Sequence, residues 1–69
     1  MKDAFSPQIA IMEHEPQGED EIELKVGDII TLRQNLGNGF SLGRNHRTNT
    51  TWNYPEYKTQ EKPTIVKYN

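Results

Sequence analysis

Side chains that could act as nucleophiles, bases or metal ligands are few in this sequence and widely spaced. The chain has no cysteine, which excludes a thiolate nucleophile, a disulfide framework and a thiolate metal site. Ser6 and Ser41 lack the neighbouring residues that would activate a serine hydroxyl. His14 and His46 are far apart, and no third ligand follows the spacing of a zinc site. We therefore expect this chain on its own to be no enzyme and to hold neither a metal ion nor a cofactor.

The carboxylates, the remaining candidates for chemistry, are concentrated in one segment, residues 13–28. Such a cluster within one strand-and-loop unit indicates a charged surface rather than a catalytic pair. The formal net charge is −2, with a weakly basic stretch only at residues 44–47. Because binding to nucleic acid needs a clustered basic face, nucleic acid is excluded as a partner.

The length of the chain limits what can position these side chains. A sequence of 69 residues, 32% of them hydrophobic, has room for one small domain. No apolar run approaches the length of a membrane span, so we expect no direct contact with a membrane.

The hydrophobic pattern has a period of two, which is typical of short β-strands. Alternation is clearest at residues 9–12, 22–24, 30–32, 40–42 and 64–68. Turn-forming residues separate these runs. The expected turns are Pro16-Gln17-Gly18, Val26-Gly27-Asp28, residues 35–39 and Gly43-Arg44-Asn45. Tyr54-Pro55-Glu56-Tyr57 could form one 3-10 turn. The pattern predicts an all-β domain, a small barrel or sandwich.

The order of these segments resembles an SH3 domain. Residues 10–14 (A-I-M-E-H) correspond to its A-L-Y-D-Y strand, 18–21 (G-E-D-E) to the acidic RT loop and 22–30 to the diverging turn with the following strand. Residues 39–41 (G-F-S) resemble G-W-W, and 54–57 (Y-P-E-Y) resemble F-P-x-N-Y, one residue short. The resemblance implies an SH3-like barrel of five to six short antiparallel strands with one 3-10 turn. We expect a linker at 1–7, the barrel at 8–62 and a C-terminal extension at 63–69 that could add a strand. Ile22 and Leu24 should fill the barrel.

A closer resemblance is to the C-terminal SH3 domain of the α-1,6-fucosyltransferases. It rests on residues 8–11, 20–22, 27–30, 39–41, 54–58 and the V-K-Y tail at 66–68. It implies a non-catalytic module of an enzyme that transfers fucose from GDP-fucose to the core GlcNAc of N-glycans. The module would support fold, assembly and acceptor recognition. The partners implied are the enzyme's own catalytic domain, a second subunit and the N-glycan acceptor. The implied location is the Golgi lumen, within a type II membrane protein.

The family's glycan contact is implied to lie in the loop after the strand at residues 29–32. Relatives carry N-H-W-D-G-Y-S there, and this chain carries Asn35-Leu36-Gly37-Asn38-Gly39-Phe40-Ser41. Leu36 therefore takes the place of the glycan-binding histidine. An apolar contact from Leu36 and hydrogen bonds from Asn35 or Asn38 remain as expected glycan or domain contacts. The alternative is a turn shaped only by glycine and asparagine.

An adaptor SH3 domain that binds proline-rich peptides is the alternative function. Adaptors grip a polyproline helix between aromatic ridges, beside an acidic loop that pairs with a basic residue of the ligand. Here the ridge positions are degenerate, because they carry Met12, His14, Phe40, Pro55 and Tyr57. The acidic loop retains Glu19, Asp20 and Glu21, which we interpret as solvated surface, and the ring of His14 is expected at the barrel rim. A third hypothesis is a purely structural barrel without a ligand.

Two further features lie close together. Asn49-Thr50-Thr51 matches the N-glycosylation sequon, which makes Asn49 a candidate acceptor. Trp52 stands where the resembled family has glycine. It could anchor an interface or cover the open end of the barrel.

Overall fold

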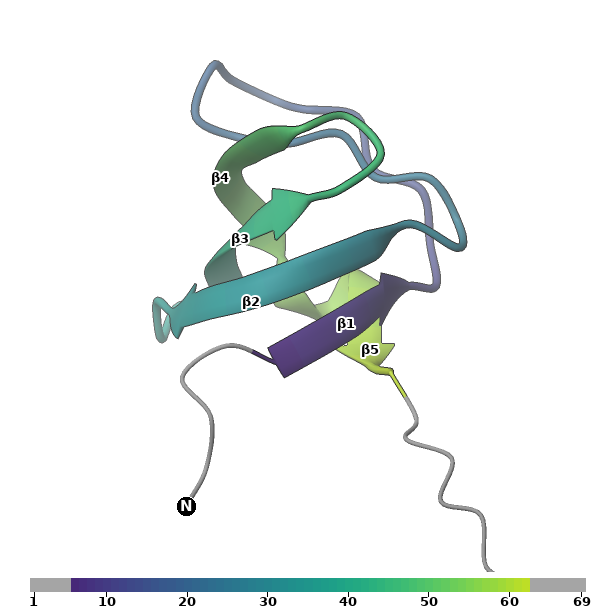
Figure 1. Cartoon of the computed structure of the whole chain (residues 1–69). Helices are drawn as coiled ribbons and strands as arrows, with labels where there is room; N and C mark the ends of the chain where they lie inside the picture. The colour runs from purple at the N-terminus through teal and green to yellow at the C-terminus, as the bar shows by residue number, and fades with distance from the viewer. Residues whose placement is uncertain (1–5, 63–69) are drawn as a thin grey trace, which may run out of the picture.

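The computed structural model describes residues 6–62 and contains five β-strands and one 3-10 turn (Figure 1). The elements are β1 (Ser6–Ala10), β2 (Ile29–Asn35), β3 (Phe40–Asn45), β4 (Thr50–Pro55), η1 (Glu56–Lys58) and β5 (Thr59–Glu61). They form one sheet in the order β4-β3-β2-β1-β5, and each neighbouring pair is antiparallel. The predicted all-β class, strand number and 3-10 turn are confirmed.

The segment from residue 11 to residue 28, called the RT loop here, connects β1 to β2 and arches over the top of the molecule (Figure 1). Its two arms are joined at an antiparallel bridge between His14 and Leu24. Its tip pairs with β4, where Ile22 N donates to Asn53 O at 2.9 Å and Asn53 N donates to Asp20 O at 3.0 Å. The loop thus provides hydrogen-bond partners for an otherwise open sheet edge.

The core is small and is formed by five buried residues from four parts of the chain. They are Ala10, Ile22, Leu24, Ile30 and Tyr54, each at most 2% exposed, with Leu32 packed against them. The prediction that Ile22 and Leu24 fill the barrel is confirmed. Because both come from the RT loop, that loop supplies side chains to the core, although much of it is exposed. Burial also raises the pKa of the Tyr54 phenol to about 12.

The predicted turn at Gly43-Arg44-Asn45 is wrong, because these residues form the end of β3. The turn follows at residues 46–49. Gly43 is required by packing: a Cβ there would lie 2.8 Å from Thr31 O and 2.8 Å from Tyr54 Cε1. Glycine lets β3 approach the core closely, which is a different use from the positive φ that a turn needs.

Asp28 and Asn45 form a buried polar network that joins the start of β2 to the end of β3. The Asn45 side chain is fully buried, and its Nδ2 donates to Glu23 O (2.9 Å) and Asp28 Oδ2 (2.8 Å). Asp28 Oδ2 also accepts Lys25 N (2.9 Å), and Asp28 Oδ1 accepts Arg47 Nε (2.8 Å). Burial by itself would raise the pKa of Asp28, but the hydrogen bonds from Arg47, Asn45 and Lys25 hold it below its ordinary value.

The chain ends bear on the predicted domain boundaries. β1 begins at Ser6 and so includes two residues expected in the linker. The expected extension at 63–69, with its alternating run at 64–68, lies outside the described residues. Within residues 6–62 no helix has the length and apolar character needed to cross a bilayer.

Candidate functional site

His14 occupies a ridge position of the predicted peptide groove, but it is only 8% exposed. Its Nε2 lies 2.8 Å from Glu21 Oε1, and its Nδ1 lies 3.1 Å from Lys58 Nζ. Since a lysine ammonium can only donate, Nδ1 accepts and Nε2 carries the proton donated to Glu21. The ring therefore does more than pack on the rim: it ties the RT loop to η1, and both of its nitrogens are engaged.

Glu21 is the inner end of the acidic loop and serves the same internal network. Its Oε1 accepts Gln17 N at 2.9 Å as well as the His14 ring. The Gln17 backbone N–H and the His14 ring hold the pKa of Glu21 below its ordinary value. The interpretation of the acidic loop as solvated surface thus fits the exposed Glu19 and Asp20, whereas Glu21 is half-buried and internally bonded.

The other groove positions differ widely in exposure. Met12 (48%) and Tyr57 (67%) are exposed, Phe40 is half-buried and Pro55 is buried. Lys58 Nζ lies over the Tyr57 ring, 5.7 Å from its centroid, while also contacting His14. Where an adaptor has continuous aromatic ridges, this chain therefore presents one tyrosine beside a polar, internally bonded histidine.

The loop at residues 36–39, called the n-Src loop here, is a tight turn held by hydrogen bonds. Gly37 and Gly39 have φ values of 82° and 91°, which glycine adopts without strain. Asn35 Oδ1 accepts Gly37 N (2.8 Å), and Asn38 Oδ1 accepts Phe40 N (3.2 Å). Leu36 remains exposed, at 37%. Both asparagines thus shape the turn through their oxygens, as such side chains do in Asx turns.

The n-Src loop is fixed to η1. Asn35 Nδ2 donates to Glu56 Oε1 at 3.3 Å, and Glu56 N donates to Gly39 O at 2.9 Å. Among the described residues, Asn38 Nδ2 makes no hydrogen bond, so this amide can donate to a ligand. The three residues predicted as the n-Src contact therefore lie together on one exposed turn.

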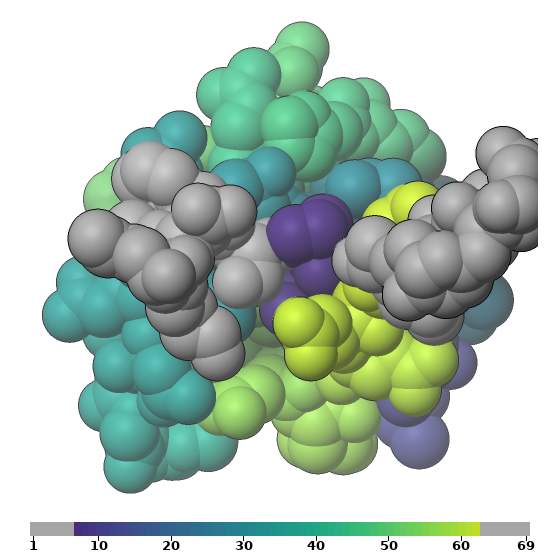
Figure 2. Space-filling model, turned by 60° about the horizontal axis from the view of Figure 1, so that its bottom comes forward, coloured from purple at the N-terminus to yellow at the C-terminus, as the bar shows by residue number. Residues whose placement is uncertain are grey.

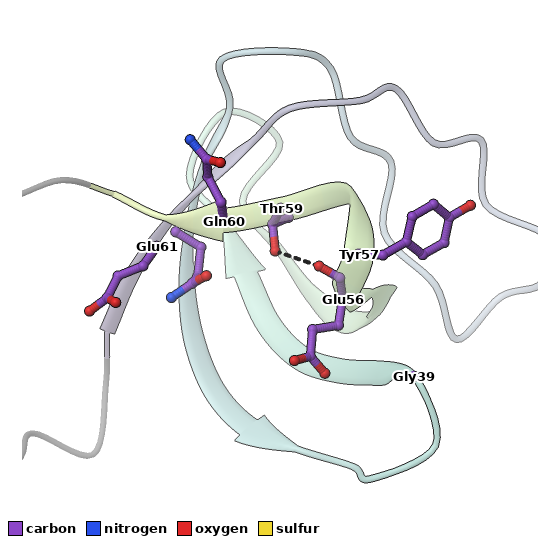
Figure 3. Close-up of a pocket in the computed structure, with 7 residues that line it drawn as sticks. Gly39, Glu56, Tyr57, Thr59, Gln60 and Glu61 are labelled. Carbon is purple, nitrogen blue, oxygen red and sulfur yellow. Dashed lines mark hydrogen bonds between the residues drawn. The ribbon is translucent and has the colours of Figure 1, made fainter.

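Beside this turn lies an open hollow of about 480 Å³. Figure 3 shows Tyr57 and Glu61 at its two ends, with Glu56 and Thr59 between them. Thr59 Oγ1 donates to Glu56 O at 3.1 Å, which holds the turn from η1 into β5. The full lining is Gln8, Gly39, Glu56, Tyr57, Thr59, Gln60 and Glu61.

Most of the residues that line the hollow were not predicted as site residues from the sequence. Tyr57 belongs to the predicted groove and Gly39 to the predicted loop. Gln8, Glu56 and the β5 residues were not singled out, because β1 and β5 become neighbours only through the sheet (Figure 2, purple beside yellow). A sequence signal did exist: three polar residues, Thr59, Gln60 and Glu61, follow the 3-10 turn directly.

The chemistry of the hollow suits a polyhydroxyl ligand. Its two carboxylates accept hydrogen bonds, and its two glutamine amides both donate and accept them. Tyr57 adds a flat apolar ring with a polar tip. Apolar surface with a few placed hydrogen-bonding groups is the usual composition of a small-molecule site. Among the described residues, no three histidine or carboxylate side chains gather closely enough to hold a metal ion.

Two predicted features lie outside this region. Asn49 is exposed in the turn between β3 and β4, at the end of β3 opposite the n-Src loop (Figure 1). Trp52 is 53% exposed on β4. Neither contributes to the hollow.

The sequence has curated relatives among the glycosyltransferases. It is 33% identical over 57 residues to the α-(1,6)-fucosyltransferase of Drosophila melanogaster, and 42% identical over 50 residues to that of Caenorhabditis elegans. These alignments cover 83% and 72% of this chain, but only 9% of each relative. No protein-family model matches the sequence.

Solved structures with the same architecture are SH3 domains. The SH3 domain of yeast NBP2 superposes with a TM-score of 0.77 at 24% identity, covering 84% of this chain and 98% of that one. The same yeast domain in complex with a Ste20p peptide superposes with a TM-score of 0.80 at 22% sequence identity, and the match covers 91% of this chain and 94% of that one. The C-terminal SH3 domain of myosin IB from Entamoeba histolytica, with a bound peptide, has a TM-score of 0.77 at 21% sequence identity. That match covers 90% of this chain and 100% of the other. At these identities the likeness establishes the fold.

Proposed function

Because this chain is an SH3 domain related to the α-(1,6)-fucosyltransferases, we propose that it is a non-catalytic module of such an enzyme. In this role it supports the fold and assembly of the parent and contacts the N-glycan acceptor during core fucosylation. The parent works in the Golgi lumen as a type II membrane protein. Its catalytic domain and a second subunit are the protein partners.

The observation that carries the acceptor contact is the open hollow next to the n-Src loop, whose lining includes four carboxylate or amide side chains beside Tyr57. Asn38 Nδ2 and the carboxylates of Glu56 and Glu61 offer both donors and acceptors to sugar hydroxyls. Leu36 in the n-Src loop and Tyr57 in the lining of the hollow add exposed apolar surface. The Asn35–Glu56 bond and the turn glycines hold this arrangement without a ligand, which lowers the entropy cost of binding.

The test uses the parent enzyme and measures fucose transfer from GDP-fucose to a biantennary N-glycan. The double variant Glu56→Gln, Tyr57→Ala should raise KM for the glycan severalfold and leave KM for GDP-fucose unchanged. Glu13→Gln, which removes an exposed carboxylate elsewhere, is the control and should change neither value. Unchanged acceptor kinetics in the double variant, or full activity after deletion of the whole module, would refute the proposal.

Peptide binding is the second candidate, favoured by the exposed Tyr57 and Met12 and by the peptides bound to the yeast and Entamoeba SH3 domains. The burial of His14 between Glu21 and Lys58 argues against it. A titration of the isotope-labelled chain with proline-rich peptides separates the two. Amide shifts clustered at Met12, His14 and Phe40 with micromolar peptide would favour an adaptor; no shifts with millimolar peptide would exclude it.

A further inference from the structure

The turn between β3 and β4 carries a side chain that is available for covalent modification. We propose that Asn49 is an N-glycosylation site, whose oligosaccharide extends from the end of the domain opposite the n-Src loop. This inference rests on the proposed function in one respect: the modification requires a chain that enters the secretory pathway.

The sequence requirement is met at Asn49 alone among the asparagines of residues 6–62. Asn49 is followed two positions later by Thr51, and the residue between them, Thr50, is not proline. The remaining asparagines of this range, at positions 35, 38, 45 and 53, have no serine or threonine at that spacing. The candidate therefore does not depend on a choice among several similar sites.

The local geometry leaves the reactive atom free. Asn49 is exposed in a turn with φ of 60°, and its backbone N donates to Asn45 O at 2.8 Å. Its Oδ1 accepts Arg44 Nη2 at 2.8 Å, whereas its Nδ2 makes no hydrogen bond within the described residues. Glycosylation occurs at Nδ2, so both observed hydrogen bonds survive the modification.

The transfer itself is a substitution at the first carbon of the sugar. A polyprenyl-diphosphate-linked oligosaccharide is the donor, and an oligosaccharyltransferase is the catalyst. The bond between sugar C1 and the diphosphate oxygen breaks as the bond between C1 and Asn49 Nδ2 forms. The polyprenyl diphosphate leaves with the bonding electron pair, and Nδ2 loses one proton. The product amide retains Oδ1 as the acceptor for Arg44.

The turn that carries Asn49 lies far from the n-Src loop along β3. β3 has six residues and separates Asn49 from the n-Src loop by roughly 17 Å of strand. Register pairs place Thr50 beside Asn45 at one end and Pro55 beside Phe40 at the other. A glycan on Asn49 is therefore attached at the end of β3 that lies away from the n-Src loop.

The experiment produces this chain behind a secretion leader in eukaryotic cells, fused to a reporter domain with a known sequon. The mass of the chain should increase by one oligosaccharide, and peptide N-glycosidase treatment should remove it and convert Asn49 to aspartate. Asn49→Gln and Thr51→Ala should abolish the increase, while the conservative Thr51→Ser should retain it. The added leader makes this result independent of the parent's own location.

An unmodified Asn49 beside a modified reporter sequon would overturn the proposal. A glycan that persists in both Asn49→Gln and Thr51→Ala would also overturn it, because it would lie elsewhere. Failure of the proposed function is recognised separately, by unchanged acceptor kinetics in the parent enzyme. The two outcomes therefore cannot be confused.

Discussion

The two ends of the β2–β3 hairpin use asparagine in opposite ways. At one end, Asn45 is fully buried and satisfies Asp28, Glu23 O and the backbone N of Arg47. At the other end, Asn35 and Asn38 are exposed and each shapes the n-Src loop through Oδ1. The same residue type thus fixes the fold at one end and leaves polar groups available for a ligand at the other.

The charges differ in the same way. Asp28 Oδ1 lies 2.8 Å from Arg47 Nε inside the network, so the charge of Asp28 is neutralised within the fold and is not available to a ligand. Glu56 and Glu61 lie on the surface of the hollow. We call the end of the hairpin with Asp28 and Asn45 the committed end, and the n-Src loop with the adjoining hollow the open end. A domain this small has only a few kcal/mol of stability, so we expect the committed end to control unfolding and the open end to control binding. Substitutions at the committed end should therefore change stability, and substitutions at the open end should change affinity for the glycan.

The largest effect is expected at Asn45. Asn45→Ala removes three hydrogen bonds and leaves a buried Asp28 oxygen short of a donor. We expect a loss of about 2–4 kcal/mol in the free energy of unfolding, measured by urea denaturation. Asn38→Ala is the matched control at the open end and should cost less than about 1 kcal/mol. Similar losses in both variants would contradict this division between the committed and open ends.

The second prediction concerns acid. The folded-state pKa values of Asp28 and Glu21 are both lowered, so these groups stabilise the fold above their unfolded-state pKa values. That stabilisation is lost as pH falls through the lowered values, so the free energy of unfolding should decline below about pH 4. Asp28→Asn should flatten this decline, as seen in urea titrations at several pH values.

The control for the acid experiment is Glu13→Gln, which removes one exposed carboxylate of the RT loop. It should leave the decline as steep as in the unaltered chain. A decline of equal steepness in Asp28→Asn would mean that Asp28 does not link stability to pH.

The third prediction addresses the open end. Tyr57→Ala removes the exposed ring at the edge of the hollow but no core contact, because the side chain is 67% exposed. We expect the dissociation constant for a free N-glycan to rise about fivefold, equivalent to about 1 kcal/mol, with the urea midpoint unchanged. Isothermal titration measures the first and denaturation the second. A change in stability without a change in affinity would mean that Tyr57 stabilises the fold and does not bind the glycan.

The smallest effect is expected at Leu36. Leu36→His adds a hydrogen-bond donor and acceptor on an exposed turn, at the position where the family resemblance implies a histidine. We expect a gain in glycan affinity of about two- to fivefold, measured by the same titration. Weaker binding would indicate that the apolar leucine side chain is itself the contact.

Much of this architecture is predictable from local patterns. The alternation at Ile22 and Leu24 predicts burial, and the glycines at 37 and 39 predict a tight turn. The role of Gly43 is not predictable in this way, because a turn and a close strand contact give the same sequence signal. Only the register that places Gly43 opposite Leu32 and Trp52 separates the two.

Only the part of the candidate site that is contiguous in the sequence was predictable. Asn35, Leu36 and Asn38 are contiguous, so the turn could be recognised from the sequence. The hollow combines Gln8 of β1 with Glu61 of β5, which are register partners across the sheet. The engagement of His14 by Lys58, 44 positions away, likewise depends on the tertiary fold.

The central claim is that the open end binds the N-glycan and the committed end does not. The most direct measurement is a titration of the isotope-labelled chain with a biantennary N-glycan, followed by amide chemical shifts. We predict saturable shifts at Leu36, Gly39 and Tyr57, with Asp28 and Asn45 unmoved. Absence of shifts at millimolar glycan, or shifts confined to the Asp28–Asn45 end, would contradict the account.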